Sequence, residues 1–317
     1  MNLWRLILRR LVLIAITLVL VSLIIFGVTQ VLPGDVAEML AGQMGTEETV
    51  KLLRERLGLN RPLYIQYLDW FWGFLTLDVG NSLSFDQPIM PLLLERIQRS
   101  LLLGGIALVE VTFFGIVMGV FAAVRKEKLF DNVASITSFI IISIPEFVSG
   151  SLMVLFLAGI WLRIFPAGGY APMSDGFGDW AMHLILPSTT LTLILLAYVM
   201  RMTRSSMIEV LRQNYIRTAY LKGLPENTVI FRHALKNALL PTVTLIANNI
   251  GFLIGGIVIV EKVFAFPGLG QLMINAISYR DIPTLQSCAM VVGAIYILAN
   301  LAADLAYLYL NPKTRES

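Results

Sequence analysis

Uncharged apolar stretches alternate with short charged segments along most of this chain. Two stretches, residues 100–124 and 132–162, are interrupted by one acid each, Glu110 and Glu146. Four others, of 21 to 24 residues, contain no Asp, Glu, Lys or Arg: residues 11–34, 180–200, 237–260 and 282–303. About 20 helical residues cross the roughly 30 Å hydrocarbon core of a bilayer. The pattern therefore predicts an all-α membrane protein with six transmembrane helices.

Composition agrees with this prediction. Hydrophobic residues make up 57% of the chain and charged residues only 14%, whereas about a quarter of the residues in soluble globular proteins are charged. A secretory signal is the alternative interpretation of the first apolar stretch. That stretch is longer than the apolar core of a signal, and no small-residue cleavage pattern closes it. We therefore expect a retained first transmembrane helix.

The distribution of basic residues predicts an orientation. If the N-terminus lies inside, the inner segments contain 15 of the 24 Lys and Arg residues, and seven of these fall in residues 201–236. The two short outer loops then contain only Arg163, Lys262 and Arg280. Cytoplasmic loops of membrane proteins carry such an excess. We expect both termini in the cytoplasm, and the net charge of +3 then reflects topology rather than binding to nucleic acid.

No motif indicates catalysis or metal binding. The single cysteine cannot form an internal disulfide, and the two histidines, His183 and His233, fall on opposite sides of the membrane in this topology. The sequence contains no P-loop, no H-E-x-x-H and no G-x-S-x-G. We therefore expect no catalytic residue, no metal and no cofactor in this chain. An intramembrane enzyme with a dispersed site has no positive support.

The segment between the first two spans contains one predicted helix, followed by an aromatic stretch. Residues 46–58 form an amphipathic helix, with Thr46 as its N-cap and Gly58 as its stop. Aromatic residues that suit a membrane–water interface follow it: Tyr64, Tyr67, Trp70 and Trp72. A surface-lying aromatic belt explains these residues, and a platform for an external partner is the alternative.

Residues 202–241 form a polar, basic segment between two of the most apolar spans. The helix of the fourth span is predicted to continue to residue 222 without a break, and Gly223 then offers a left-handed stop. Pro225 favours the start of a second helix, which runs to about Leu240 before Pro241 marks the fifth span. Such a helix, glycine turn and helix is too polar to insert in the bilayer and needs a surface on which to dock.

The motifs of this segment resemble those of a known family. Residues 215–224 read YIRTAYLKGL and residues 233–241 read HALKNALLP, similar to the "EAA" loop of permease subunits in bacterial ABC importers of the dipeptide, oligopeptide and nickel class. Tyr220 and Leu221 depart from the usual Arg-Ala of this loop. Other matches are spread over nearly the whole chain: LPGD at 32–35, LGLNRPLYIQY at 57–67, RMTRSSMIEVL at 201–211, FPGLG at 266–270 and NP at 311–312.

The resemblance implies a type I ABC importer permease fold in the bacterial inner membrane. It implies a second homologous permease, two cytoplasmic ATPases that use ATP and Mg, and a periplasmic or lipid-anchored solute-binding protein as partners. The loop would carry the coupling helix that docks on an ATPase, with Ala219 and Gly223 leaving a smooth face for close approach. A merely solvated basic loop is the alternative. The expected coupling residues are Tyr215, Arg217, Thr218, Ala219, Lys222, Gly223 and Leu224.

Polar residues in the spans are candidates for the transport pathway because unpaired acids are costly in a membrane. Glu146 follows Pro145, which predicts a local kink. For Glu110 and Glu146, interhelical hydrogen bonding or a position at the flank of a span is the alternative role. The candidates for the pathway are Glu110, Glu146, Asn248 and Asn249, and bridging between helices is the alternative for the two asparagines. An outer gate or hinge, or an ordinary turn, is predicted at Glu261, Pro267, Gly268 and Gly270.

Three regions follow along the chain. Residues 1–94 contain the first transmembrane helix and a periplasmic segment, residues 95–308 a five-helix permease core with the coupling loop at about 203–240, and residues 309–317 a cytoplasmic tail. Short peptides are the expected substrate, with nickel chelates, glutathione or oligosaccharides as alternatives in the class. Outside the class, an ATP-independent channel or secondary transporter and an intramembrane enzyme remain open.

Overall fold

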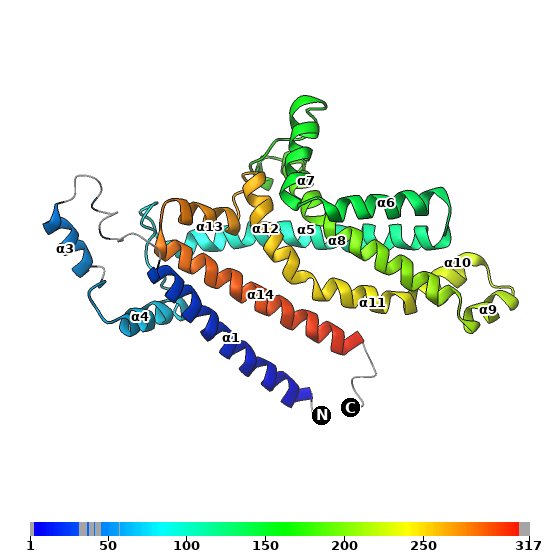
Figure 1. Ribbon diagram of the computed structural model, residues 1–317, viewed down its shortest axis with the longest axis horizontal. Helices are drawn as coiled ribbons and strands as arrows, with labels where there is room; N and C mark the ends of the chain where they lie inside the picture. Colours follow the sequence, from blue (N-terminus) through cyan, green and yellow to red (C-terminus); the bar gives the residue numbers. More distant parts are fainter. Residues whose placement is uncertain (1–2, 32–36, 38–40, 42–45, 57, 311–317) are drawn as a thin grey trace. The chain divides into compact units, whose positions relative to one another are not determined.

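The computed structural model describes residues 3–31, 37, 41, 46–56 and 58–310 (Figure 1). Within these residues the regular elements are helices, apart from one isolated bridge between Asn81 and Pro88. The LPGD and NP motifs and most of the predicted C-terminal tail lie outside the described residues. Contacts divide the chain into two compact units, of which the first comprises residues 100–266 and 298–310 and the second residues 3–99 and 267–297.

Most helices belong to one unit, and two helices cross the boundary between units. The helices that cross are α5 (Ile89–Val124) and α14 (Ile282–Leu310). The other elements of the first unit are α6 (Leu129–Ser143), α7 (Glu146–Met153), η1 (Val154–Ile160), η2 (Met173–Asp175), α8 (Phe177–Leu211), α9 (Asn214–Leu221), α10 (Glu226–Thr228), η3 (Val229–Ala234), α11 (Leu235–Asn248) and α12 (Ile250–Val263). Those of the second unit are α1 (Leu3–Val31), α3 (Glu47–Arg56), α4 (Leu63–Leu75) and α13 (Leu269–Ser278).

The prediction of six spans is confirmed when each bent helix pair counts as one span. Four single helices are long and apolar enough to cross a bilayer: Leu8–Val31, Ile89–Val124, Phe177–Leu211 and Ile282–Ala303. Two further spans are broken. The first bends by 108° between α6 and α7, where Pro145 produces the predicted kink, and the second bends by 48° between α11 and α12.

Close packing of α5 on α8 forms the centre of the first unit, where the two helices run side by side (Figure 1). Gly115 faces Val199, and Gly119 faces Thr203 and the carbonyl oxygen of Met200, so closely that neither glycine has room for a Cβ. Small residues four apart allow helix backbones to approach in this way. Gly115 and Gly119 are therefore positions of close packing between α5 and α8. Buried apolar side chains continue the contact: Leu103, Ala107 and Val111 of α5 with Leu191 and Leu195 of α8.

Two helix boundaries in the polar segment differ from the prediction. The fourth span does not continue to residue 222, because α8 ends at Leu211 and α9 begins at Asn214 after an extended Gln213. After this break, the chain reverses direction, so that α9 packs against the rest of the first unit. Pro241 lies inside α11 rather than at its start. A proline is tolerated in a membrane helix where the local backbone adjusts, and six residues of π-helix, η3, precede α11 here.

In the second unit, α4 packs on α1 through aromatic residues. Tyr67 and Trp70 lie with ring centroids 5.5 and 5.8 Å from that of Phe26, and the Tyr67 hydroxyl is 2.8 Å from Ser22 Oγ. Tyr64 and Trp72 are exposed. Tyr67 and Trp70 are therefore partly buried against α1, whereas Tyr64 and Trp72 are exposed, and the belt and the platform for an external partner both stay predictions.

The remaining local predictions for the outer segments have mixed outcomes. The helix at 46–58 is confirmed: Thr46 Oγ1 accepts a hydrogen bond from the Thr49 amide at 3.3 Å, and Gly58 has a φ of 69°. The outer segment between the fifth and sixth spans contains a further helix, α13, which was not predicted from the sequence. Its apolar residues Leu269, Leu272 and Met273 pack with Ile89 and Leu93 of α5, all within the second unit.

Gly119→Ala tests the α5–α8 contact. The added methyl group would lie 2.6 Å from Thr203 Cβ and 2.7 Å from Met200 O, so we expect the free energy of unfolding to fall by about 1–3 kcal/mol, as in other overpacked contacts. Gly105→Ala, in the same helix, is the matched control because nothing lies within 4 Å of its added methyl group. Reversible unfolding in mixed micelles measures both variants, and equal effects would contradict the packing described.

Candidate functional site

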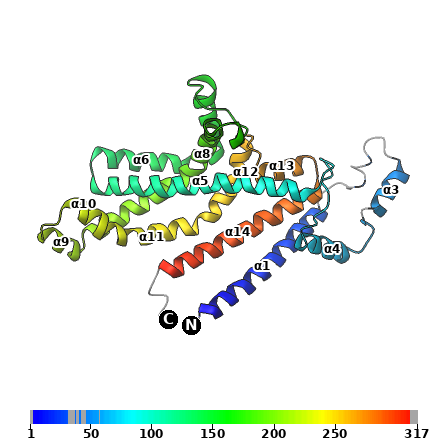
Figure 2. The same ribbon diagram turned by 180° about the vertical axis from the view of Figure 1, so that it is seen from behind.

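The polar segment forms a compact cap at the end of α8 and α11 (Figure 2). Helix α9 ends in a turn in which the Gly223 amide donates to the Tyr220 carbonyl oxygen at 2.9 Å. Gly223 has a φ of 74°, which confirms the predicted left-handed stop, and Pro225 precedes the first residue of α10 as predicted. The segment is therefore a folded structure with its own turn geometry.

One face of this cap is buried against the ends of α5 and α8. Ile216 and Ala219 of α9 pack with Val120 of α5 and Met207 of α8, and the cluster is completed by residues of η3 and α11. Ala219 is only 7% exposed. The prediction that Ala219 and Gly223 share a smooth outer face is therefore wrong, because the break before Asn214 turns Ala219 toward the first unit's own core.

The opposite face of the cap is exposed and combines apolar with basic side chains. Leu221 is 80% exposed, and Tyr220 is exposed beside it. The predicted coupling residues on this face are Tyr215, Arg217, Thr218, Lys222 and Gly223, whereas Leu224 is partly buried. Tyr215 is held in place because its hydroxyl accepts a hydrogen bond from Asn237 Nδ2 at 2.8 Å. Tyr220 and Leu221, the two departures from the family motif, both lie on this exposed face.

Glu110 joins two spans of the first unit. Its carboxylate oxygens accept hydrogen bonds from Ser188 Oγ and Thr192 Oγ1 of α8, each at 2.9 Å. Hydroxyl groups one helical turn apart can approach the same carboxylate. The alternative role proposed from the sequence, interhelical hydrogen bonding, is the one that the contacts of Glu110 match.

Glu146 has a different environment, at the first residue of α7 and directly after the 108° bend. Its side chain is 8% exposed, and Oε1 is buried without a hydrogen-bond partner among the described residues. Both carboxylate oxygens lie 2.7 Å from the point where a Cβ would stand on Gly256 of α12. The Glu146 carboxylate thus packs against α12 at Gly256, where no side chain covers the helix backbone.

Asn248 and Asn249 mark the second bend, between α11 and α12. Asn249 Nδ2 donates to the carbonyl oxygen of Leu245 in its own helix at 2.8 Å, and Asn248 is exposed. The Leu245 carbonyl oxygen also accepts the Asn249 backbone amide at 3.1 Å. The choice between a pathway role and bridging between helices stays a prediction for both asparagines.

The four predicted gate residues divide between the two units. Glu261 is fully buried in the first unit, where Ser100 Oγ donates to its carboxylate, and the Phe266 amide donates to its carbonyl oxygen at 2.8 Å. Pro267, Gly268 and Gly270 belong to the second unit, where they lead into α13. The residue with positive φ in this turn is Ala265, at 47°, rather than a glycine.

In the described part of the chain, no group of three His, Cys, Asp or Glu side chains is placed to hold a metal ion.

Sequence comparison identifies the family. Residues 115–316 match the model described as "Binding-protein-dependent transport system inner membrane component", and residues 3–104 match the model of the N-terminal part of such components. The chain belongs to this family. It is an ABC transporter permease subunit, and such subunits are not enzymes.

Relatives of similar length are named as permease proteins of transport systems. The permease is 38% identical over 309 residues to a probable peptide ABC transporter permease protein of Sinorhizobium fredii, and 36% identical over 310 residues to a putative peptide transport system permease protein of Brucella abortus. It is 37% identical over 334 residues to the dipeptide transport system permease protein DppB of Escherichia coli. Each comparison covers 98% of both chains.

A solved structure, described as a crystal structure of an amino acid ABC transporter with histidines, is 18% identical, with a TM-score of 0.46. That comparison covers 69% of the permease and 92% of the other chain.

Gly256→Ala tests the contact below Glu146 in the permease. The methyl group would displace the carboxylate and meet Leu191 Cδ1 at 2.9 Å, so we expect a loss of about 1–3 kcal/mol in the free energy of unfolding. Adding Glu146→Ala should recover part of this loss, with an interaction energy of about 0.5–3 kcal/mol. Gly255→Ala is the control, because nothing lies within 4 Å of its added methyl group. Additive effects in the double variant would exclude the contact.

Proposed function

We propose that this permease is the membrane-spanning subunit of an ATP-driven importer for short peptides in the bacterial inner membrane. With a second, homologous permease it forms the pathway, a periplasmic or lipid-anchored solute-binding protein delivers the peptide, and two cytoplasmic ATPases hydrolyse ATP with Mg. The observation that carries the proposal is identity of 36–38% over 98% of the chain to relatives named as peptide or dipeptide permeases. Nickel chelates, glutathione and oligosaccharides are the alternative substrates.

The cap formed by α9, α10 and η3 is the proposed coupling segment. Two properties support this role: a buried face anchored on α5 and α8, and an exposed face with Leu221 and Tyr220 beside Arg217 and Lys222. Apolar and arginine side chains are frequent at the centres of protein interfaces. When an ATPase displaces a segment that is anchored in this way, the displacement is transmitted directly to two transmembrane helices. The excess of basic residues at 201–236 supports a cytoplasmic location for it and for both termini.

Glu146 is the strongest of the proposed pathway residues. Its carboxylate is buried at a bend, where Oε1 has no hydrogen-bond partner in the part of the chain that the structure describes, whereas the carboxylate of Glu110 accepts hydrogen bonds from two hydroxyl groups of α8. Asn248 and Asn249 lie at the second bend and stay candidates for the same pathway. Glu261, Pro267, Gly268 and Gly270 remain the proposed outer gate. Family membership gives no support to an ATP-independent channel or an intramembrane enzyme.

Leu221→Glu tests the coupling segment. We expect co-purification of the ATPases to fall at least about tenfold, since burying an unpaired charge in an interface costs more than about 1.4 kcal/mol. Because Leu221 is 80% exposed, the variant should keep its level in the membrane. Leu52→Glu, at a residue that is 54% exposed in α3, is the matched control and should retain the ATPases. Full ATPase recovery with Leu221→Glu would reject this docking surface.

Uptake by the complete importer in proteoliposomes tests the substrate. We expect a labelled dipeptide to accumulate only with the solute-binding protein and ATP, and unlabelled short peptides to compete with it. Nickel chelates, glutathione and oligosaccharides should not compete at equal concentration. Competition by one of these compounds but not by peptides would assign the permease to that substrate instead.

A further inference from the structure

Helix α6, the first half of the broken span, packs along α8, and the side chains that it buries are short. Its buried residues are Asp131, Ala134 and Ser138, which lie along one stripe of the helix. Ala134 packs with Met200 of α8 and Ala122 of α5, and Ser138 Oγ donates to the Ser135 carbonyl oxygen of its own helix. Small residues bury little apolar area, so the apolar attachment of α6 is weak.

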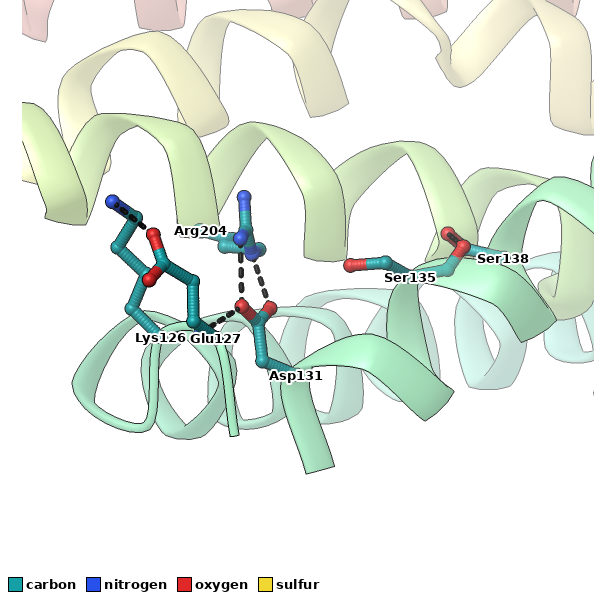
Figure 3. A network of polar contacts seen from close by, with 6 residues as sticks. All are labelled: Lys126, Glu127, Asp131, Ser135, Ser138 and Arg204. Atoms are coloured by element: carbon teal, nitrogen blue, oxygen red, sulfur yellow. Dashed lines mark hydrogen bonds and ion pairs between the residues drawn. The ribbon is translucent and has the colours of Figure 1, made fainter. Parts of the chain in front are cut away.

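The strongest polar contact of this attachment is an ion pair between Asp131 and Arg204 of α8 (Figure 3). The guanidinium group binds both carboxylate oxygens: Nε contacts Oδ1, and Nη2 lies 2.7 Å from Oδ2. Oδ2 also accepts the Glu127 amide at 2.9 Å, which ties the α5–α6 turn to the same carboxylate. Asp131 is 1% exposed. A paired, bidentate contact of this kind fixes both the distance and the direction between two helices.

A second contact between the same helices is weaker and less directional. The Arg201 guanidinium lies 4.2 Å from the centroid of the Phe139 ring, on side chains that are both exposed. The ion pair is therefore the contact that sets the register of α6 along α8.

Arg204 also lies on α8 close to the residues that contact the proposed coupling segment. Three residues further along α8, Met207 is fully buried against Ile216 and Ala219 of α9. One residue before Arg204, Thr203 shares a hydrogen bond of 3.1 Å with Thr242 of α11. On its other side, Asp131 is carried by α6, which leads to the bend at Pro145 and to Glu146. The ion pair thus joins the helix that carries the cap to the span that contains the buried acid.

We propose that Asp131 and Arg204 are positioning residues whose ion pair transmits movement of the coupling segment to the broken span α6–α7. This inference rests on the proposed function of the cap. When an ATPase displaces α9, α8 moves with it because their contact is a packed apolar cluster, and α6 follows because the bidentate pair fixes it to α8. Without the pair, α8 moves while α6 lags, so that ATP is hydrolysed without movement of the pathway helices.

The test uses the complete importer in proteoliposomes and measures peptide transported per ATP hydrolysed. In Asp131→Asn the ion pair is lost, while an amide oxygen remains to accept the Glu127 amide. We expect ATP hydrolysis to continue and the transport ratio to fall about tenfold, within the range of coupling carried by such contacts. Asp69→Asn removes an exposed Asp–Arg pair, Arg61 to Asp69 at 3.0 Å, and should leave the ratio unchanged.

A second variant separates transmission from folding. Asp131→Cys with Arg204→Cys, in a Cys288→Ser background, is reconstituted in the uncoupled form and then joined with a short bifunctional thiol reagent. Because the chain has already folded, we expect the new link to restore the ratio by transmission alone.

An unchanged ratio in Asp131→Asn would overturn the inference, and so would loss of transport and hydrolysis in parallel without recovery on cross-linking. In both cases the proposed function would stand, provided that the wild-type importer shows ATP-driven uptake. Absence of that uptake in the wild type would overturn the proposed function and the inference together.

Discussion

The contact between α5 and α8 at Gly115 and Gly119 determines how the first unit is built. In a bilayer the lipid tails are as apolar as the helix surfaces, so association of helices depends on close packing and hydrogen bonds rather than on exclusion of water. The glycines provide the close packing, and Glu110, Ser188 and Thr192 provide hydrogen bonds in the same interface. The resulting helix pair is the support on which the cap and α6 are placed.

Around this support, the attachments differ in strength, and the differences suit their proposed roles. The cap is fixed by a cluster of apolar side chains in which Met207, Ile216 and Val229 are fully buried. Helix α6 is fixed by small residues and one ion pair. In the proposed mechanism the cap must be firmly anchored so that its displacement reaches α8, and the ion pair makes α6 follow α8. The two broken spans, at Pro145 and Asn249, are also places where a helix can change direction without losing a whole row of backbone hydrogen bonds.

The acids of the membrane-spanning segments show that the same residue type serves different purposes. Glu110 and Glu261 both accept hydrogen bonds from serine or threonine side chains, and these contacts join helices of the first unit. Among the described residues, Glu146 Oε1 is buried without a hydrogen-bond partner, and the carboxylate rests against Gly256. Because an unsatisfied polar group in a membrane is costly, Glu146 stays the strongest of the proposed pathway residues. In the second unit, Asp281 accepts the hydroxyl of Ser82 and the amide of Thr284, and therefore orders the loop before α5.

The sequence by itself determined the class of the protein, its six spans and its family. These properties depend on composition, on the length of apolar stretches and on local motifs. Each of these involves residues that are close together in the chain. The stop at Gly223, the cap at Thr46 and the kink at Pro145 were predictable for the same reason. The residues of the polar segment were also predictable as a group, but not the face that each residue occupies.

Only the tertiary structure decided which residues face one another. The break at Gln213 turns Ala219 inward and leaves Leu221 exposed, and nothing in the local sequence prevents α8 from continuing. The partners of Glu110 lie 78 and 82 residues away, and Arg204 lies 73 residues from Asp131, so no local pattern connects them. Pro241 inside α11 and helix α13 depend in the same way on packing against distant helices, which can override local preference.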